Sequence, residues 1–180
     1  MFMFYCENVL SQNEVKEIYN ELFNEHLWAV TNPYNEENLE GIYLNSLIQD
    51  TQNGKTNIYN PYLFGLFKGI SVAVNNKLKE KYGFNLNINN KNIVRTQLNA
   101  QKKSNFNKFH IDGIESYSII GFLTPFWDKI WGGSLQIENQ NIAFTPGDFL
   151  VFKANRLHDA LPIIKETPFY RVTVAMFVNP

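Results

Sequence analysis

The sequence predicts a mainly β (α+β) fold, in which about eight strands form a double-stranded β-helix, or cupin-like jelly roll, beside two N-terminal helices. Three observations lead to this prediction. Helical periodicity occurs twice in the first half, strand-like alternation fills the second half, and turn-forming dipeptides separate its short apolar segments. We expect one domain over residues 1–180, with helical support over about 1–90 and the jelly-roll core over about 91–180.

Each expected helix has a start signal. Apolar residues recur at helical spacing over residues 11–28, where Ser11 and Glu14 match a capping box, a pattern in which each residue satisfies an orphan backbone N–H. A second helix is expected over residues 60–82, because Asn60 suits the N-cap position and proline follows it at the first helical position.

Between the helices, residues 31–60 are polar, aromatic and irregular, with one short strand expected near residues 42–44. This segment is long for a connection, and we hypothesise that it forms a lid over an active site. The C-terminal half is predicted to hold strands at residues 93–98, 109–112, 117–123, 134–137, 142–144, 149–152, 157–161 and 170–178.

Composition restricts the functional classes. The formal net charge of -1 gives no overall field that would recruit nucleic acid or an anionic membrane. The single cysteine, Cys6, cannot form an internal disulfide and suits a buried apolar position. No stretch approaches the roughly 20 apolar residues that span a bilayer, and the N-terminal residues lack the features of a signal peptide. We therefore expect a cytoplasmic protein with no membrane partner. The net charge disfavours a nucleic-acid substrate without excluding one, because a local basic patch could recruit it.

A candidate metal site lies in the strand-rich half. On a strand, His110 and Asp112 project from the same face because side chains alternate. His158, on a later predicted strand, offers a second imidazole. Two histidines and one carboxylate on one face of an octahedral ion leave the opposite face open, which is typical of non-haem Fe(II) oxygenases.

Arg171 supplies the context that this short motif lacks. It lies within an apolar predicted strand, where an unpaired guanidinium would be costly. Its planar fork suits a carboxylate, and Thr173 points to the same face and can donate a further hydrogen bond. Either an internal salt bridge or a carboxylate ligand would satisfy Arg171. Beside a metal triad, the ligand interpretation predicts a dicarboxylate co-substrate.

The order of these motifs resembles the prolyl-4-hydroxylase-like branch of the Fe(II)/2-oxoglutarate-dependent dioxygenase superfamily. The resemblance extends over residues 93–178, the whole strand-rich half. The motifs that carry it are RTQLN at 95–99, HID at 110–112, GFLT at 121–124, WGGSL at 131–135, PGDFLVF at 146–152, His158, and YRVT at 170–173.

The resemblance implies catalytic iron ligands at His110, Asp112 and His158, and a binder of the distal 2-oxoglutarate carboxylate at Arg171. Many members carry a tyrosine on the strand before the His-x-Asp motif. This chain has Gln97 or Asn99 there, and Gln97 can donate a hydrogen bond instead. The implied cofactors are Fe(II), 2-oxoglutarate as co-substrate and O₂, and the resemblance allows ascorbate as an additional reductant.

The implied reaction hydroxylates a peptide side chain of prolyl type or a small amino-acid-type metabolite, and releases succinate and CO₂. A retained Asp112 favours hydroxylation, since halogenating relatives carry a small residue at this position. Trp127 and Trp131 flank a loop beside the metal strands, where they either line a substrate mouth or pack at the rim. Tyr43, in the expected lid, is a further candidate for substrate binding.

Two other functions remain open. A cupin-like isomerase or hydrolase would fill the same triad with Zn²⁺ or Mn²⁺, but it would give Arg171 no specific role. A catalytically silent jelly-roll binding module would require the spacing of the three ligands to be coincidental. The sequence determines neither the substrate nor the oligomeric state.

Overall fold

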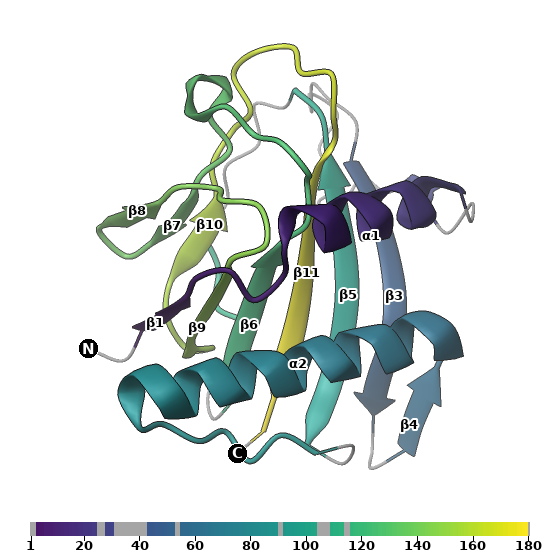
Figure 1. Cartoon of the computed structure of the whole chain (residues 1–180), viewed down its shortest axis with the longest axis vertical. Coiled ribbons are helices and arrows are strands. Elements are labelled where there is room, and N and C mark those ends of the chain that lie inside the picture. Colours follow the sequence, from purple (N-terminus) through teal and green to yellow (C-terminus); the bar gives the residue numbers. More distant parts are fainter. Residues whose placement is uncertain are drawn as a thin grey trace.

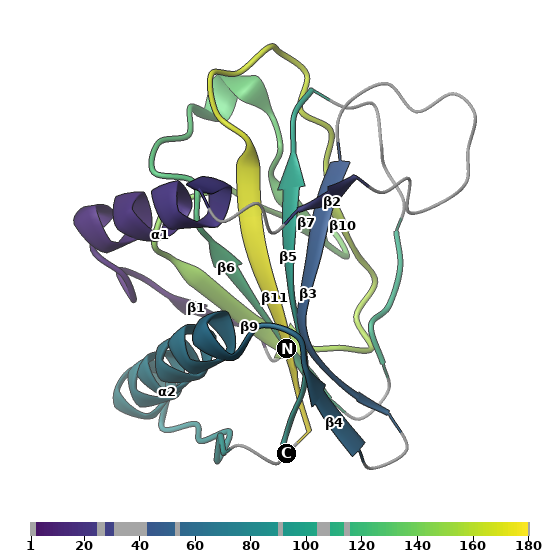
Figure 2. The same cartoon turned by 90° about the vertical axis from the view of Figure 1, so that its right-hand side faces the viewer.

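The computed structural model describes residues 3–24, 28–30, 43–52, 55–89, 92–103, 109–113 and 116–179. Two helices cover one face of a large antiparallel sheet, and a small sheet lies beyond its other face (Figures 1 and 2). The helices are α1 (Gln12–Asn24) and α2 (Pro61–Tyr82), and a 3-10 turn, η1, spans Lys129–Trp131. The strands are β1 (Met3–Cys6), β2 (Ala29–Val30), β3 (Tyr43–Gln52), β4 (Lys55–Ile58), β5 (Ile93–Gln101), β6 (Tyr117–Phe122), β7 (Leu135–Ile137), β8 (Gln140–Ile142), β9 (Phe149–Lys153), β10 (His158–Ala160) and β11 (Arg171–Val178).

The large sheet joins strands that are distant in sequence. Its order is β1-β9-β6-β11-β5-β3-β2, and β4 pairs with β3; the small sheet has the order β10-β7-β8. The described pairings are antiparallel. This arrangement, mainly β with two supporting helices, confirms the predicted jelly-roll architecture.

Both helices begin as their capping signals predict. The backbone N–H of Ser11 donates to Glu14 Oε2 at 2.7 Å, and the N–H of Glu14 donates back to Ser11 Oγ at 3.3 Å. Asn60 Oδ1 accepts from the N–H of Leu63 at 2.9 Å, and Gly83, with φ of 65°, caps the C-terminal end of α2. The first helix is shorter than expected, because α1 ends at Asn24 and residue 28 is not helical.

Alternation along β11 separates the two faces of the large sheet. Val172, Val174 and Met176 are buried in the core beneath the helices. Arg171 and Thr173, on the opposite face, line a cavity. A second apolar cluster fills the space between the two sheets and holds Phe122, Trp127, Leu135, Ile137, Phe144, Leu150, Phe152 and Ile163. The cavity therefore lies against the face of the sheet that points away from the helices.

Three local predictions were wrong. Residues 43–58 were expected to be irregular after residue 44, but they form the β3–β4 hairpin, in which Gln52 pairs with Lys55. In the sequence, an Asn-Gly dipeptide separates the two strands, and this dipeptide is a strong hairpin signal. Residues 109–112 form an isolated bridge rather than a strand, and β8 begins at residue 140 rather than 142.

The N-terminal half also contributes strands as well as helices, because β1 and β3 belong to the large sheet. The hypothesis of a lid concerns residues 31–60, of which 31–42 and 53–54 lie outside the described residues. No helix in the described ranges combines the length and apolar character needed to cross a membrane.

Candidate metal centre and co-substrate cavity

Two segments place the three predicted metal ligands. The backbone of His110 pairs with that of His158 in an isolated antiparallel bridge, and His158 opens β10. Two residues later, the N–H of Asp112 donates to the carbonyl of Ala154 at 2.9 Å. The segment from His110 to Asp112 is therefore fixed at both ends to the chain between β9 and β10.

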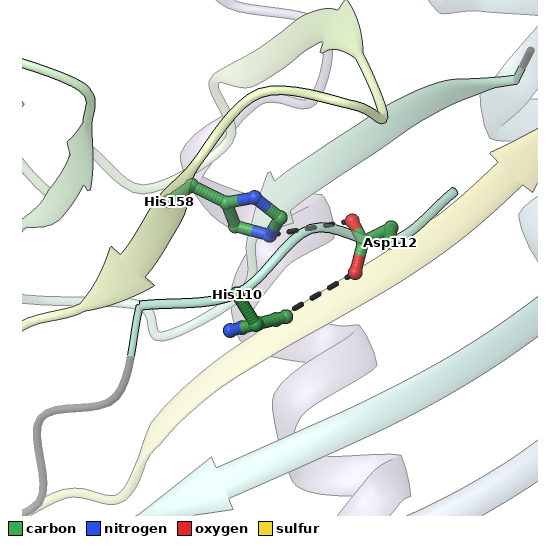
Figure 3. Close-up of side chains that lie close together, drawn as sticks. All are labelled: His110, Asp112 and His158. Carbon is green, nitrogen blue, oxygen red and sulfur yellow. Dashed lines mark ion pairs between the residues drawn. The ribbon is translucent and has the colours of Figure 1, made fainter. Parts of the chain in front are cut away.

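The three side chains point toward one another (Figure 3). His158 Nε2 lies 3.3 Å from Asp112 Oδ2, and His110 Nε2 lies 3.6 Å from Asp112 Oδ1. The two imidazole rings have centroids 4.4 Å apart. One ligand atom from each residue falls within 4.8 Å of the others, which is close enough for the three to share one cation.

Two hydrogen bonds orient the cluster from outside. Nδ1 of His158 lies 2.9 Å from the carbonyl oxygen of Arg156, to which it donates as the N–H tautomer. When His158 is neutral, as a metal ligand must be, its lone pair is thereby left on Nε2, the nitrogen that faces Asp112. The hydroxyl of Ser118, on β6, donates to Asp112 Oδ2 at 2.6 Å. Such partners fix the ring orientation and carboxylate rotamer that a metal requires.

The charge states also suit a cation. Burial alone would raise the pKa of Asp112, but the hydrogen bonds from His158 and Ser118 and the positive potential of both imidazoles bring that pKa below its usual value. Burial would lower the pKa of His158, and the contact with Asp112 outweighs burial, so that pKa is raised. The carboxylate is thus ionised at neutral pH, and a metal ion would replace the proton that the pair attracts.

A cavity of about 150 Å³ adjoins the three side chains. Asp112 and His158 are largely covered, whereas the side chain of His110 is 46% exposed. Among the described residues, the other polar lining of the cavity is Asp159 of β10 together with alternate residues of two paired strands: Gln97, Asn99 and Gln101 of β5, and Arg171 and Thr173 of β11.

Arg171 is 4% exposed, and its guanidinium donates hydrogen bonds to three acceptors among the described residues. One terminal nitrogen, Nη1, donates to the carbonyl of Gly133 at 2.7 Å and to that of Leu161 at 3.1 Å. The other, Nη2, donates to Oε1 of Gln101, its cross-strand partner on β5. The three oxygens that accept these hydrogen bonds are neutral. The guanidinium lines the cavity, where a carboxylate would complement its charge.

Sequence reasoning did not find Gln101. A signal was present, because Gln97, Asn99 and Gln101 repeat at the two-residue period and must share a face. What the sequence could not supply was the register that pairs Gln101 with Arg171.

The glycine pair before β7 makes room for Arg171. Gly133 has φ of 73°, in the left-handed region. A Cβ there would lie 3.2 Å from Arg171 Cδ and 3.1 Å from the ring of Trp127. Gly133 therefore lets the backbone approach the guanidinium closely enough for its carbonyl to accept a hydrogen bond.

The remaining predicted residues divide into two groups. Gln97 and Thr173 line the cavity, and Gln97 Nε2 donates to Asn99 Oδ1 at 3.3 Å. Trp127 instead lies in the second apolar cluster, where its ring N–H donates to the carbonyl of Gly132 at 2.9 Å. Trp131 stacks edge-on against Trp127. Among the described residues, neither tryptophan lines the cavity.

Tyr43 begins β3, where its backbone pairs with Gln101. The side chain of Tyr43 lies outside the described part of the structure. Its register position nevertheless places its backbone beside the Arg171 end of the cavity.

Solved structures with the same fold include 2-oxoglutarate/Fe(II) oxygenases. A 2OG-Fe(II) oxygenase family oxidoreductase from Burkholderia pseudomallei matches with a TM-score of 0.71 at 13% identity, over 98% of this chain and 85% of that one. This chain has the fold of the 2-oxoglutarate/Fe(II) oxygenases.

Two further structures with this fold are complexes, one with a peptide fragment and one with DNA. A Trichoplax adhaerens prolyl hydroxylase, in complex with a hypoxia-inducible-factor peptide fragment, has a TM-score of 0.63 at 16% identity, over 98% of this chain and 83% of that one. The protein NgTET1, in complex with 5mC DNA, has a TM-score of 0.66 at 20% identity, over 98% and 72%. No family model and no curated protein sequence matches this chain.

Proposed function

We propose that this protein is an Fe(II)- and 2-oxoglutarate-dependent oxygenase that hydroxylates a peptide side chain or a small amino-acid-type metabolite. The observation that carries the proposal is the shared cavity, in which His110, Asp112 and His158 converge while the buried Arg171 lines the same space. A chelating dicarboxylate can use both features at once, because its keto-acid end can bind the metal while its distal carboxylate binds the guanidinium.

The donor set fits a ferrous ion. Two neutral imidazole nitrogens and one carboxylate oxygen form the facial arrangement that non-haem Fe(II) favours. When bound, the ion and 2-oxoglutarate supply oxidative chemistry that consumes O₂ and yields succinate and CO₂. The chain's own part is to hold the triad: the Arg156 carbonyl fixes the His158 tautomer, and Ser118 fixes the Asp112 rotamer.

The co-substrate would lie with its distal carboxylate against Arg171. Gln101 holds the guanidinium through its amide oxygen, which leaves its amide N–H groups as donors. Thr173 and Gln97 line the same cavity and can donate to the remaining carboxylate oxygens. In this arrangement the strands β5 and β11 orient the co-substrate, and its keto-acid end reaches the triad.

A zinc or manganese enzyme of the cupin type would use the same three ligands. That alternative gives no role to the buried Arg171 or to its hydrogen bond with Gln101. A catalytically silent binding module would give no role to the metal triad. For the substrate, the net charge of -1 favours a peptide or a small molecule over a nucleic acid.

One experiment separates these functions. Metal-free protein is mixed with Fe(II) and 2-oxoglutarate under anaerobic conditions, and the weak visible band of an iron-chelated keto acid is recorded. Oxygen is then admitted and succinate is measured. We expect the band and succinate from the wild type and neither from His110→Ala. A wild-type protein that gives no band and no succinate, or that turns over another substrate with Zn²⁺ alone, would refute the proposal.

A further inference from the structure

A second groove adjoins the metal cavity. It has a volume of about 350 Å³, at the lower end of the range of small-molecule sites. Asp112 and Phe177 line both spaces, so the groove and the metal cavity adjoin at these two residues. The other described residues that line it are Asp50, Thr51, Val94, Arg95, Ile111 and Ser116.

The groove lies at the end of the large sheet opposite to Arg171. Arg95 and Gln101 share a face of β5, and a separation of six residues along a strand corresponds to roughly 20 Å. Gln101 pairs with Arg171, whereas Arg95 pairs with Phe177 at the other end of β11. Figure 2 shows β3, β5 and β11 side by side along this whole length. A ligand in the groove would approach the triad from the side that the co-substrate leaves open.

Two opposite charges stand next to each other in this groove. Asp50 and Arg95 are Cα partners in the β3–β5 ladder, yet among the residues that the structure describes no ion pair joins them. Asp50 Oδ2 instead accepts from the side-chain amide of Gln52 at 2.6 Å. Arg95 is exposed and Asp50 is half-buried. Each charge is therefore presented to the groove instead of being neutralised by the other.

The chemistry that complements such a pair is a zwitterion. A free α-amino acid has a carboxylate for Arg95 and an ammonium for Asp50, at adjacent positions on one carbon. A residue inside a peptide has neutral amides at both places and would leave the two charges without partners. With the two charged groups at the sheet end, the amino acid's side chain extends toward Asp112 and the metal.

We propose that this groove binds the ammonium and carboxylate of a free α-amino acid through Asp50 and Arg95, and presents its side chain for oxidation. The inference rests on the proposed function and narrows its substrate class to free amino acids. The β3–β5 register places Asp50, from a segment expected to be irregular, beside Arg95, from a strand that was predicted.

The test measures binding separately from turnover. Two panels are used, the free L-amino acids and the same residues as N-acetyl amides, and binding is detected by saturation-transfer NMR. The protein is metal-free in one series and loaded with redox-inert Zn²⁺ and 2-oxoglutarate in the other. We expect at least one free amino acid to bind in one of the series, and the blocked forms to bind at least about tenfold more weakly.

The variants Arg95→Gln and Asp50→Asn should each weaken that binding about tenfold, as expected for the loss of a charge-assisted contact, while Arg95→Lys keeps part of it. Lys79→Gln and Glu80→Gln, exposed on α2, are matched controls and should have no effect. The inference is overturned if no free amino acid binds in either series, if blocked forms bind equally well, or if the groove variants behave like the controls.

A succinate assay on the same panels distinguishes a failure of the proposed oxygenase function from a failure of the inferred substrate class. If the oxygenase function fails, free amino acids still bind but no succinate forms from 2-oxoglutarate with any addition. If only the substrate inference fails, succinate forms and is stimulated by blocked residues or peptides as strongly as by free amino acids.

Discussion

His110 and His158 exchange both of their backbone hydrogen bonds. Each N–H donates to the other's carbonyl at 3.0 Å, although 47 residues separate the two positions in the sequence. Residues that face each other in such a pair project their side chains from the same face. The imidazoles are therefore brought together by chain pairing, without any requirement for a metal to gather them.

A preformed site predicts that metal removal leaves the fold intact. After chelation, we expect near-UV and far-UV circular dichroism to stay native, and metal to raise the unfolding free energy by about 2.7 kcal/mol at a concentration of 100 times its dissociation constant. His158→Ala should retain the native spectrum and lose this metal-dependent gain. A metal-free wild type that is unfolded would show instead that the ion organises the site.

Ser118 should tune the metal affinity. Its hydroxyl donates to Asp112 Oδ2 at 2.6 Å, so Ser118→Ala frees the carboxylate to rotate. Loss of a partner of this kind typically weakens metal binding by about 10-fold to 100-fold. Competition with a chromogenic chelator measures the dissociation constant. Ser134→Ala, in the segment before β7, is the control and should bind metal as the wild type does; equal affinities in both variants would contradict the role of Ser118.

Gln101→Glu should impair the use of 2-oxoglutarate. The new carboxylate would accept from Arg171 Nη2 as the amide does, and it would neutralise the charge that the co-substrate needs. We expect the KM for 2-oxoglutarate to rise at least about tenfold, by the loss of a charge-assisted hydrogen bond. Metal affinity should be unchanged. Gln101→Leu, which removes the support without adding a charge, should have a smaller effect, and the reverse order would argue against charge neutralisation.

Gly133→Ala should disturb both backbone and guanidinium. The left-handed φ of 73° disfavours a side chain, and the added Cβ would press on Arg171 Cδ. We expect a loss of about 1–3 kcal/mol in unfolding free energy together with a raised KM for 2-oxoglutarate. Gly65→Ala is the matched control: it lies in α2 with open space around its Cβ, and it should stabilise the protein by about 0.5–1 kcal/mol.

Stability should fall at alkaline pH because of Cys6. Burial raises the pKa of its thiol to about 11 from an ordinary value of 9.0. Above pH 9 the unfolded chain loses this proton while the folded chain keeps it, so the unfolding free energy decreases as pH rises toward 11. The largest slope from one such group is about 1.4 kcal/mol per pH unit. Denaturant titrations should show this component in the wild type and not in Cys6→Ala. Identical slopes would mean that other groups cause the loss.

Local signals in the sequence were sufficient for the helices and for most strands. The capping residues Ser11 and Asn60 mark helix starts because they satisfy backbone N–H groups within three residues. The alternation of β11 distinguishes its core face from its cavity face for an equally local reason. The hairpin of β3 and β4 was missed although an Asn-Gly dipeptide marked it, since its strands carry few apolar residues.

The sequence by itself determined which side chains were candidates: His110, Asp112, His158 and Arg171 stood out by residue type and spacing. Only the tertiary structure decided which distant residues support and adjoin them. Gln101 holds Arg171, Ser118 holds Asp112, and Asp50 stands beside Arg95, each through pairing or packing between separate strands. The physical reason is that periodicity fixes the face on which a residue lies, whereas its neighbour on the next strand depends on register, which forms only when the whole sheet assembles.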